Sequence, residues 1–163
     1  MRYLIILRGP AGAGKTTVSK HLIETLGKDK TYSLDLDITL DKESEFNENL
    51  NKALGYENVI GMMFWGLKHT EAPQQWLARF KDNGYVILSV VLYASLKTLI
   101  HRVQYRGYDC KDAAEMRHHF SEFEKIKNVF ANRAGVKEIS VNTDNMISED
   151  VVNEILRHLN SEH

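Results

Sequence analysis

The sequence predicts an α/β protein built on a parallel sheet. Short apolar runs of strand length alternate with segments whose apolar residues recur at helical spacing. Such alternation is typical of parallel strands that are joined by helical crossovers and covered by helices on both faces. The predicted strands are 3–7, 31–36, 58–64, 86–93 and 137–141, and the predicted helices are 16–26, 43–54, 74–82, 96–104, 113–134 and 148–159.

In the first half of the chain, apolar runs mark the strands and glycines mark the ends of the helices. Tyr3–Leu7 is predicted to be a buried strand because it is short, apolar and followed by Gly9 and Pro10. The helices at 16–26 and 43–54 each place apolar side chains on one face, and they stop at Gly27 and Gly55. The strands after these helices begin at residues 31 and 58.

The second half repeats the same alternation with a longer helical region. Val86–Tyr93 is nearly all apolar, which predicts a strand buried on both faces. The pattern at 113–134 predicts a long helix that ends at Gly135. The last helix is expected to start with Ser148 as its N-cap, because acidic residues occupy the next turn.

Composition places limits on the class of protein. The 163 residues are predicted to form one domain over 1–163, and the net charge of −1 gives no global attraction to nucleic acid. The single cysteine, Cys110, cannot form an internal disulfide, which suits a reducing compartment. The first apolar run is too short for a signal sequence, and no stretch reaches the length of a membrane span. We therefore expect a cytoplasmic protein with no membrane partner.

A glycine-rich segment between the first strand and the first helix predicts a phosphate-binding loop. Residues 9–16 read GPAGAGKT, which satisfies the pattern G-x-x-x-x-G-K-[ST] in the strand–loop–helix context that the chemistry requires. Small residues let backbone N–H groups wrap a phosphate, and the helix N-terminus adds partial positive charge. We call this segment the phosphate cradle; its expected nucleotide-binding residues are Gly9, Pro10, Ala11, Gly12, Ala13, Gly14, Lys15, Thr16 and Thr17.

Each polar residue of the cradle has an expected role. Lys15 can bridge the β- and γ-phosphates of ATP, and the Thr16 hydroxyl can hold Mg²⁺. Thr17 is placed to contact the α-phosphate. Two carboxylates, Asp35 and Asp37, lie at the end of the second strand; because alternating strand residues share a face, both can point into one crevice.

With these motifs the chain resembles the small P-loop kinases, a group that includes shikimate and gluconate kinases, zeta-toxin-like and chloramphenicol phosphotransferases, and polynucleotide 5′-hydroxyl kinases. The resemblance lies in residues 9–17, 34–37 and 102–107 and in the order of elements along nearly the whole chain. It implies a three-layer α/β/α P-loop NTPase fold whose five-stranded parallel sheet has the order 2-3-1-4-5. It also implies a mobile lid at about residues 102–120.

The same resemblance assigns roles on the acceptor side of the site. It implies that Asp37 binds the acceptor hydroxyl and takes its proton and that Asp35 lies on the Mg²⁺ side, although the two roles could be exchanged. Arg102 and Arg106 lie one helical turn apart, and either can neutralise charge on the transferred phosphoryl group or stack on adenine. The chain departs from the family at Gly61, where an acid usually helps to hold Mg²⁺. Either Asp35 takes over that role, or metal binding and turnover are weakened, or the glycine only allows close packing.

The predicted function is ATP-dependent phosphoryl transfer to a hydroxyl group of a small molecule, with ATP and Mg²⁺ as cofactors. The region between the second and third strands is short, which favours a compact acceptor. A polynucleotide 5′-hydroxyl kinase or nucleotide kinase is the alternative enzyme, and nucleic acid is a less favoured partner given the charge balance. A non-catalytic ATP-binding switch is the third interpretation, with Gly61 as its basis. The sequence leaves the acceptor and the oligomeric state open.

Overall fold

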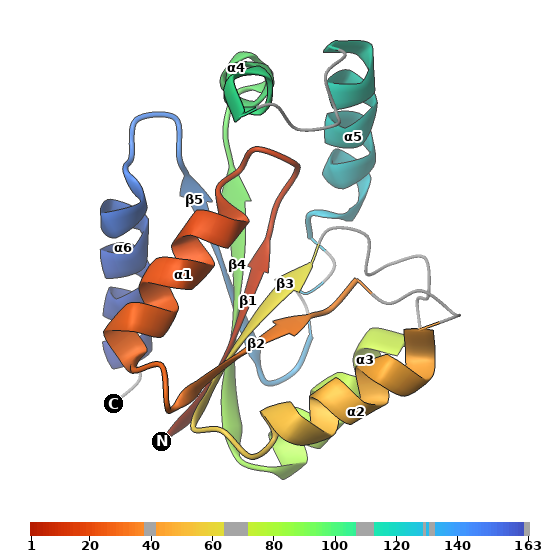
Figure 1. Ribbon diagram of the computed structural model, residues 1–163, viewed down its shortest axis with the longest axis vertical. Helices are drawn as coiled ribbons and strands as arrows, with labels where there is room; N and C mark the ends of the chain where they lie inside the picture. The colour runs from red at the N-terminus through yellow and green to blue at the C-terminus, as the bar shows by residue number, and fades with distance from the viewer. Residues whose placement is uncertain (38–41, 64–71, 107–112, 129, 131–132, 162–163) are drawn as a thin grey trace.

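A parallel sheet forms the centre of the molecule. The computed structural model describes residues 1–37, 42–63, 72–106, 113–128, 130 and 133–161. Within these ranges five strands form one sheet in the order β2-β3-β1-β4-β5, and every neighbouring pair is parallel. This confirms the predicted fold class and strand order. β1 lies at the centre of the sheet, so the segment after it emerges in the middle of the sheet's carboxyl edge (Figure 1).

The elements match the predicted alternation closely. The strands are β1 (Arg2–Arg8), β2 (Thr31–Asp35), β3 (Asn58–Met63), β4 (Tyr85–Tyr93) and β5 (Val136–Asn142). The helices of the described ranges are α1 (Lys15–Leu26), α2 (Glu43–Ala53), α3 (Ala72–Asp82), α4 (Leu96–Arg106), α5 (Ala113–Ile126) and α6 (Ser148–Asn160).

Alternating side chains of β1 belong to two different hydrophobic cores. Ile5 and Leu7 pack with apolar residues of α1 and α6, whereas Leu4 and Ile6 pack with those of α2 and α3. All four are fully buried, because parallel strands covered on both faces have no solvent-facing side. Figure 1 shows α1 and α6 on one side of the sheet and α2 and α3 on the other. None of the helices in the described ranges is both long and apolar enough to cross a membrane.

Helix α5 ends eight residues before the predicted boundary. The sequence predicts a helix to Ala134, but α5 stops at Ile126. The guanidinium of the buried Arg8 donates hydrogen bonds of 2.6 Å to the carbonyls of Ile126 and of Lys127, and the fully buried Phe130 joins the core under α3. The helix therefore ends where its last carbonyls meet a cation from β1, a long-range contact that helical periodicity does not reveal.

The start of α6 also differs from the prediction. Ser148 is the first helical residue, and Ile147 rather than Ser148 occupies the N-cap position. The backbone N–H of Ile147 donates to the Asp150 carboxylate at 3.3 Å. The Ser148 hydroxyl instead forms a 2.9 Å hydrogen bond with Nδ1 of His21 on α1, so a tertiary partner replaces the expected cap.

Gly61 lies where a side chain would collide with the core. It pairs with Leu34 on β2 and with Ile6 on β1. A Cβ atom at Gly61 would lie 2.5 Å from Cδ1 of Leu36, which is 1% exposed. The geometry therefore supports the packing interpretation of this glycine, since an acid at residue 61 would have to displace Leu36.

The packing at Gly61 can be tested by a double-mutant cycle. We expect Gly61→Ala to lower the free energy of unfolding by about 1–3 kcal/mol, because the added methyl overpacks the space that Leu36 fills. In a Leu36→Ala background, Gly61→Ala should lower the free energy of unfolding by clearly less, because the clashing atoms of Leu36 are gone. Urea denaturation of the four proteins measures both values. Equal costs in the two backgrounds would show that Leu36 is not the reason for the glycine.

Candidate active site

The phosphate cradle curls from the end of β1 over the first turn of α1. Gly12 and Gly14 have φ angles of 81° and 99°, a left-handed conformation that glycine adopts without steric cost. The turn is closed by a 3.1 Å hydrogen bond from the Ala13 N–H to the Pro10 carbonyl. Helix α1 starts at Lys15, so the N–H groups of its first turn, which have no partner inside a helix, face the loop. This arrangement is a site for an anion.

The side chain of Lys15 folds back over the cradle. Its Nζ donates hydrogen bonds to the carbonyls of Gly9 and of Pro10, the latter at 3.2 Å. Burial lowers the pKa of Lys15 to about 8, and the negative charge of Asp37 raises it part of the way back. Lys15 therefore links the loop after β1 electrostatically to the segment after β2.

Both predicted carboxylates lie at one small cavity beyond β2. Asp35 ends the strand, and its Oδ1 accepts a 2.9 Å hydrogen bond from the Asp37 backbone N–H. The cavity has a volume of about 100 Å³, and the residues that line it are Asp35, Asp37, Lys42, Glu45, Phe46 and Asn49. Three carboxylates and one ammonium group surround it, so the described lining is net negative.

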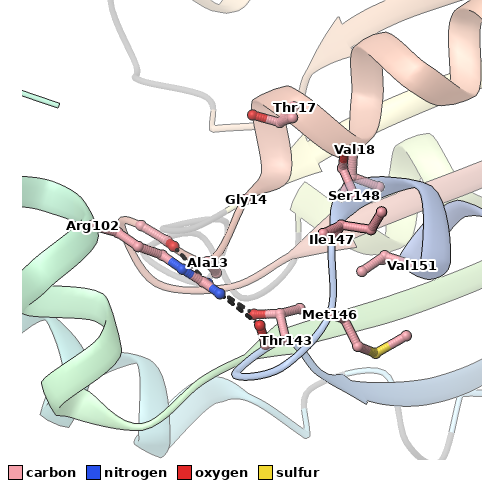
Figure 2. A pocket seen from close by; sticks show the side chains of 11 residues that line it. Ala13, Gly14, Thr17, Val18, Arg102, Thr143, Met146, Ile147, Ser148 and Val151 are labelled. Atoms are coloured by element: carbon pink, nitrogen blue, oxygen red, sulfur yellow. Dashed lines mark hydrogen bonds between the residues drawn. The ribbon is translucent and has the colours of Figure 1, made fainter. Parts of the chain in front are cut away.

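A second, larger cavity lies on the other side of the cradle. Its volume is about 270 Å³, and Figure 2 shows its lining residues, which come from the cradle, α1, α4, the segment that joins β5 to α6, and the first turn of α6. The walls are partly apolar through Val18, Met146, Ile147 and Val151. Ile147 is 64% exposed, so an apolar side chain stands open at the mouth of this cavity.

Arg102 of α4 spans this larger cavity from the cradle to the loop after β5. Its Nη1 donates to the Gly12 carbonyl at 3.2 Å and to the Thr143 hydroxyl at 3.0 Å, and its Nη2 donates to the Thr143 carbonyl at 2.6 Å (Figure 2). Thr143 is in turn fixed to the end of β4, because its N–H donates to the Tyr93 carbonyl at 2.8 Å. The guanidinium is therefore held as a flat wall beside the cavity.

The structure brings most of the predicted site residues to one edge of the sheet. The side chain of Arg106 and the residue Gly107 lie outside the described part of the chain, so the second arginine of the predicted pair stays a prediction. Thr16 is exposed near the start of α1, and it and Asp35 offer the hard oxygen donors that Mg²⁺ prefers. Among the described residues, no three or more His, Cys, Asp or Glu side chains are arranged so that they could hold a metal ion by themselves.

Sequence reasoning missed several residues that line the two cavities. Phe46 and Asn49 line the smaller cavity, but their helical spacing on α2 is typical of a packed face. Met146 and Ile147 line the larger one, where two apolar residues before a helix carry no signal of their own. Only their position after β5, at the carboxyl edge of the sheet, could have drawn attention to them.

This fold and this cradle together define a small P-loop kinase. Residues 5–127 match the family described as AAA domain (AAA_18), well over half of the chain, and the chain belongs to that family. The predicted membership of the small P-loop kinase group is thereby confirmed.

Curated relatives and solved structures agree with this assignment. The chain is 31% identical over 157 residues to a Thermococcus kodakarensis protein provisionally named an adenylate kinase, with 94% of this chain and 83% of that protein covered. It is 26% identical over 178 residues to cytidylate kinase of Saccharolobus islandicus, with 97% and 91% covered. Shikimate kinase from Acinetobacter baumannii, solved with shikimate, has a TM-score of 0.60 at 22% identity, over 99% of this chain and 95% of that one.

The lowered pKa of Lys15 predicts how stability depends on pH. Between its folded pKa of about 8 and its ordinary value of 10.5, the unfolded chain binds more protons than the folded one, so stability rises with pH. Relative to Lys15→Met, the wild-type free energy of unfolding should rise by about 3 kcal/mol over this window.

Urea denaturation at pH 7.5 and at pH 10.5 measures this difference for each protein. Lys20→Met is the matched control, since Lys20 is an exposed lysine of the same helix. The free energy of unfolding of Lys20→Met should depend on pH as that of the wild type does. If Lys15→Met also shows this pH dependence, Lys15 is not the group that titrates.

Proposed function

We propose that the protein transfers the γ-phosphoryl group of ATP to a hydroxyl group of a small molecule. One observation carries the proposal: Asp37 lines the small cavity, and its charge also acts on Lys15 of the phosphate cradle. A carboxylate in this position can orient a hydroxyl towards a phosphate that Lys15 holds. The acceptor oxygen then forms the new bond to phosphorus, the bond between that phosphorus and the β-phosphate oxygen breaks, and Asp37 takes the hydroxyl proton.

The residues of the cradle are proposed to hold the donor. The N–H groups at the start of α1 bind the β-phosphate, and Lys15 exchanges loop carbonyls for β- and γ-phosphate oxygens. Thr17 contacts the α-phosphate. Thr16 and Asp35 would hold Mg²⁺, which would neutralise part of the phosphate charge. Most of the rate in such a reaction comes from positioning and charge stabilisation rather than from proton removal.

The larger cavity is proposed to take the adenine ring. It combines apolar walls with the fixed plane of Arg102, and a guanidinium stacks well on an aromatic base. This supports adenine stacking, rather than contact with the transferred phosphoryl group, as the role of Arg102. A phosphate contact by the Arg106 side chain and a lid at about 102–120 are further proposals, and both rest on the family resemblance.

A nucleotide kinase is the second candidate, and the names of the relatives favour it. A cytidylate or adenylate kinase acts on a nucleotide, so its acceptor group is itself a phosphate. The charge of the small cavity favours the hydroxyl acceptor instead, because its described lining holds three carboxylates and a single lysine, Lys42. A phosphate dianion there would meet repulsion that a neutral hydroxyl avoids.

The role of Asp37 predicts a selective loss of turnover. Asp37→Asn should lower phosphoryl transfer about 100- to 10,000-fold, because the amide keeps the shape but cannot take the proton. ATP affinity should stay close to that of the wild type, because Asp37 does not line the adenine cavity. The assay measures ADP release with Mg-ATP and panels of sugars, nucleosides, antibiotics, 5′-hydroxyl oligonucleotides, CMP and AMP.

Two controls make this result interpretable. Asp29→Asn changes an exposed carboxylate in the turn between α1 and β2 and should leave turnover unchanged. Lys15→Met should abolish transfer to every acceptor. Turnover of CMP or AMP with no hydroxyl acceptor would favour the nucleotide kinase, and tight ATP binding without any turnover would favour the switch protein.

The proposed role of Arg102 predicts weaker ATP binding. Arg102→Leu should raise the dissociation constant for Mg-ATP about tenfold, because it removes the stacking plane and the bridge from Gly12 to Thr143. Isothermal titration calorimetry measures the constant. Arg79→Leu, which changes an exposed arginine of α3, is the control. An Arg102→Leu protein with wild-type affinity would place adenine elsewhere.

A further inference from the structure

Arg8 is an arginine buried next to the phosphate cradle, with no role in the proposed transfer itself. It is the last residue of β1, it directly precedes Gly9, and it is 1% exposed. Its Nη1 lies 3.2 Å from the Glu138 carboxylate of β5, and that carboxylate also accepts a 3.0 Å hydrogen bond from the Ser89 hydroxyl of β4. The guanidinium lies against Phe130, with 5.1 Å from its Cζ to the ring centroid. Glu138, which Ser89 holds in turn, and the ring of Phe130 thus surround this one side chain.

The other contacts of Arg8 reach the carboxyl end of α5. Nη1 donates to the Lys127 carbonyl and Nη2 to the Ile126 carbonyl, each at 2.6 Å. These are carbonyls that a helix cannot satisfy internally, and they carry the negative end of its dipole. Figure 1 shows α4 and α5 beyond the carboxyl ends of the strands, at the same edge of the sheet as the cradle. Arg8 therefore connects the end of α5 to the strand from which the cradle emerges.

Burying the guanidinium of Arg8 carries an energetic cost. Burial lowers the pKa of Arg8 to about 10 although Glu138 opposes the shift. The Nε atom is buried without a hydrogen-bond partner in the described part of the chain. An apolar residue, like the four before it in β1, would fill a buried place without these penalties. An apolar residue cannot supply the forked set of N–H donors with which the guanidinium binds two carbonyls and a carboxylate at once.

A short series of contacts leads from Arg8 to the phosphate-binding lysine. The residue after Arg8 is Gly9, whose carbonyl accepts a hydrogen bond from Nζ of Lys15. Arg8 and Gly9 share a peptide bond, so a displacement of Arg8 would be passed directly to the residue that carries this carbonyl. A shift at the end of α5 would reach Lys15 through two residues only.

We propose that Arg8 is a positioning residue that couples the phosphate cradle to the carboxyl end of α5. Occupancy of the cradle and the order of α5 then depend on each other. Because such coupling is reciprocal, ATP should order α5 to the same extent that an ordered α5 improves ATP binding. The proposal rests on the proposed ATP site, and it assigns Arg8 no contact with substrate.

The test must separate this coupling from a simple loss of stability. Arg8→Met alone leaves the Glu138 carboxylate buried without its cation, which destabilises the fold whatever the role of Arg8. The double variant Arg8→Met/Glu138→Gln removes both charges and keeps an acceptor for Ser89. Its thermal midpoint should lie above that of Arg8→Met, because no unpaired charge stays buried. Arg79→Met is the control for the loss of an arginine at an exposed position.

Two measurements are made on each protein: the dissociation constant for Mg-ATP, and the hydrogen exchange of the α5 amides with and without Mg-ATP. In the wild type and in Arg79→Met, Mg-ATP should slow exchange near the carboxyl end of α5. In the double variant that response should vanish, and the dissociation constant should rise about tenfold. A stable double variant with wild-type affinity and a wild-type exchange response would overturn the proposal.

Two further outcomes have a defined meaning. If the double variant does not fold, Arg8→Lys takes its place, since it keeps a charge opposite Glu138 but lacks the fork that binds both carbonyls. Its wild-type behaviour in both measurements would likewise overturn the proposal. If the wild type itself does not bind Mg-ATP, the proposed function fails, and this result is distinct from a failure of the coupling.

Discussion

The site depends on one constraint, which is that parallel strands end at the same edge of their sheet. The cradle comes after β1, the two acids lie at the end of β2, and Thr143 comes after β5. These segments are far apart in the sequence, yet the strand order β2-β3-β1-β4-β5 places the cradle between the acids and Thr143. Each of these three strands therefore contributes to the site through residues at or just beyond its carboxyl end. A chain of ordinary length can in this way place the proposed donor and acceptor pockets along one edge of one sheet.

Lys15 connects the cradle electrostatically with the segment after β2. It belongs to the cradle by its hydrogen bonds and to the acceptor side by its interaction with Asp37, while Arg102 closes the opposite side of the cradle. The proposed adenine cavity and the proposed acceptor cavity thus lie on either side of the cradle. Arg8 adds a connection behind the cradle, between its first glycine and the end of α5.

The sequence was sufficient for features that depend on local pattern. The strand order, the strand–loop–helix cradle and the clustering of Asp35 with Asp37 could be predicted from apolar periodicity, from one motif with its family resemblance and from the rule about strand ends. It was insufficient where a distant partner decides the outcome. α5 ends at Ile126, where Arg8 binds the last carbonyls, and Ser148 pairs with His21 instead of capping α6. Gly61 looked like a missing metal ligand until the packing of Leu36 against it could be seen.

The chemical nature of the acceptor group is the central claim, and ³¹P NMR tests it most directly. The wild-type protein is incubated with Mg-ATP and pooled hydroxyl compounds in one sample, and with Mg-ATP, CMP and AMP in another. We predict a new phosphate monoester resonance that grows in step with ADP in the first sample and no conversion of nucleoside monophosphates in the second. Formation of CDP or of ADP from the monophosphates, with no monoester in the first sample, would contradict the account and establish phosphate as the acceptor.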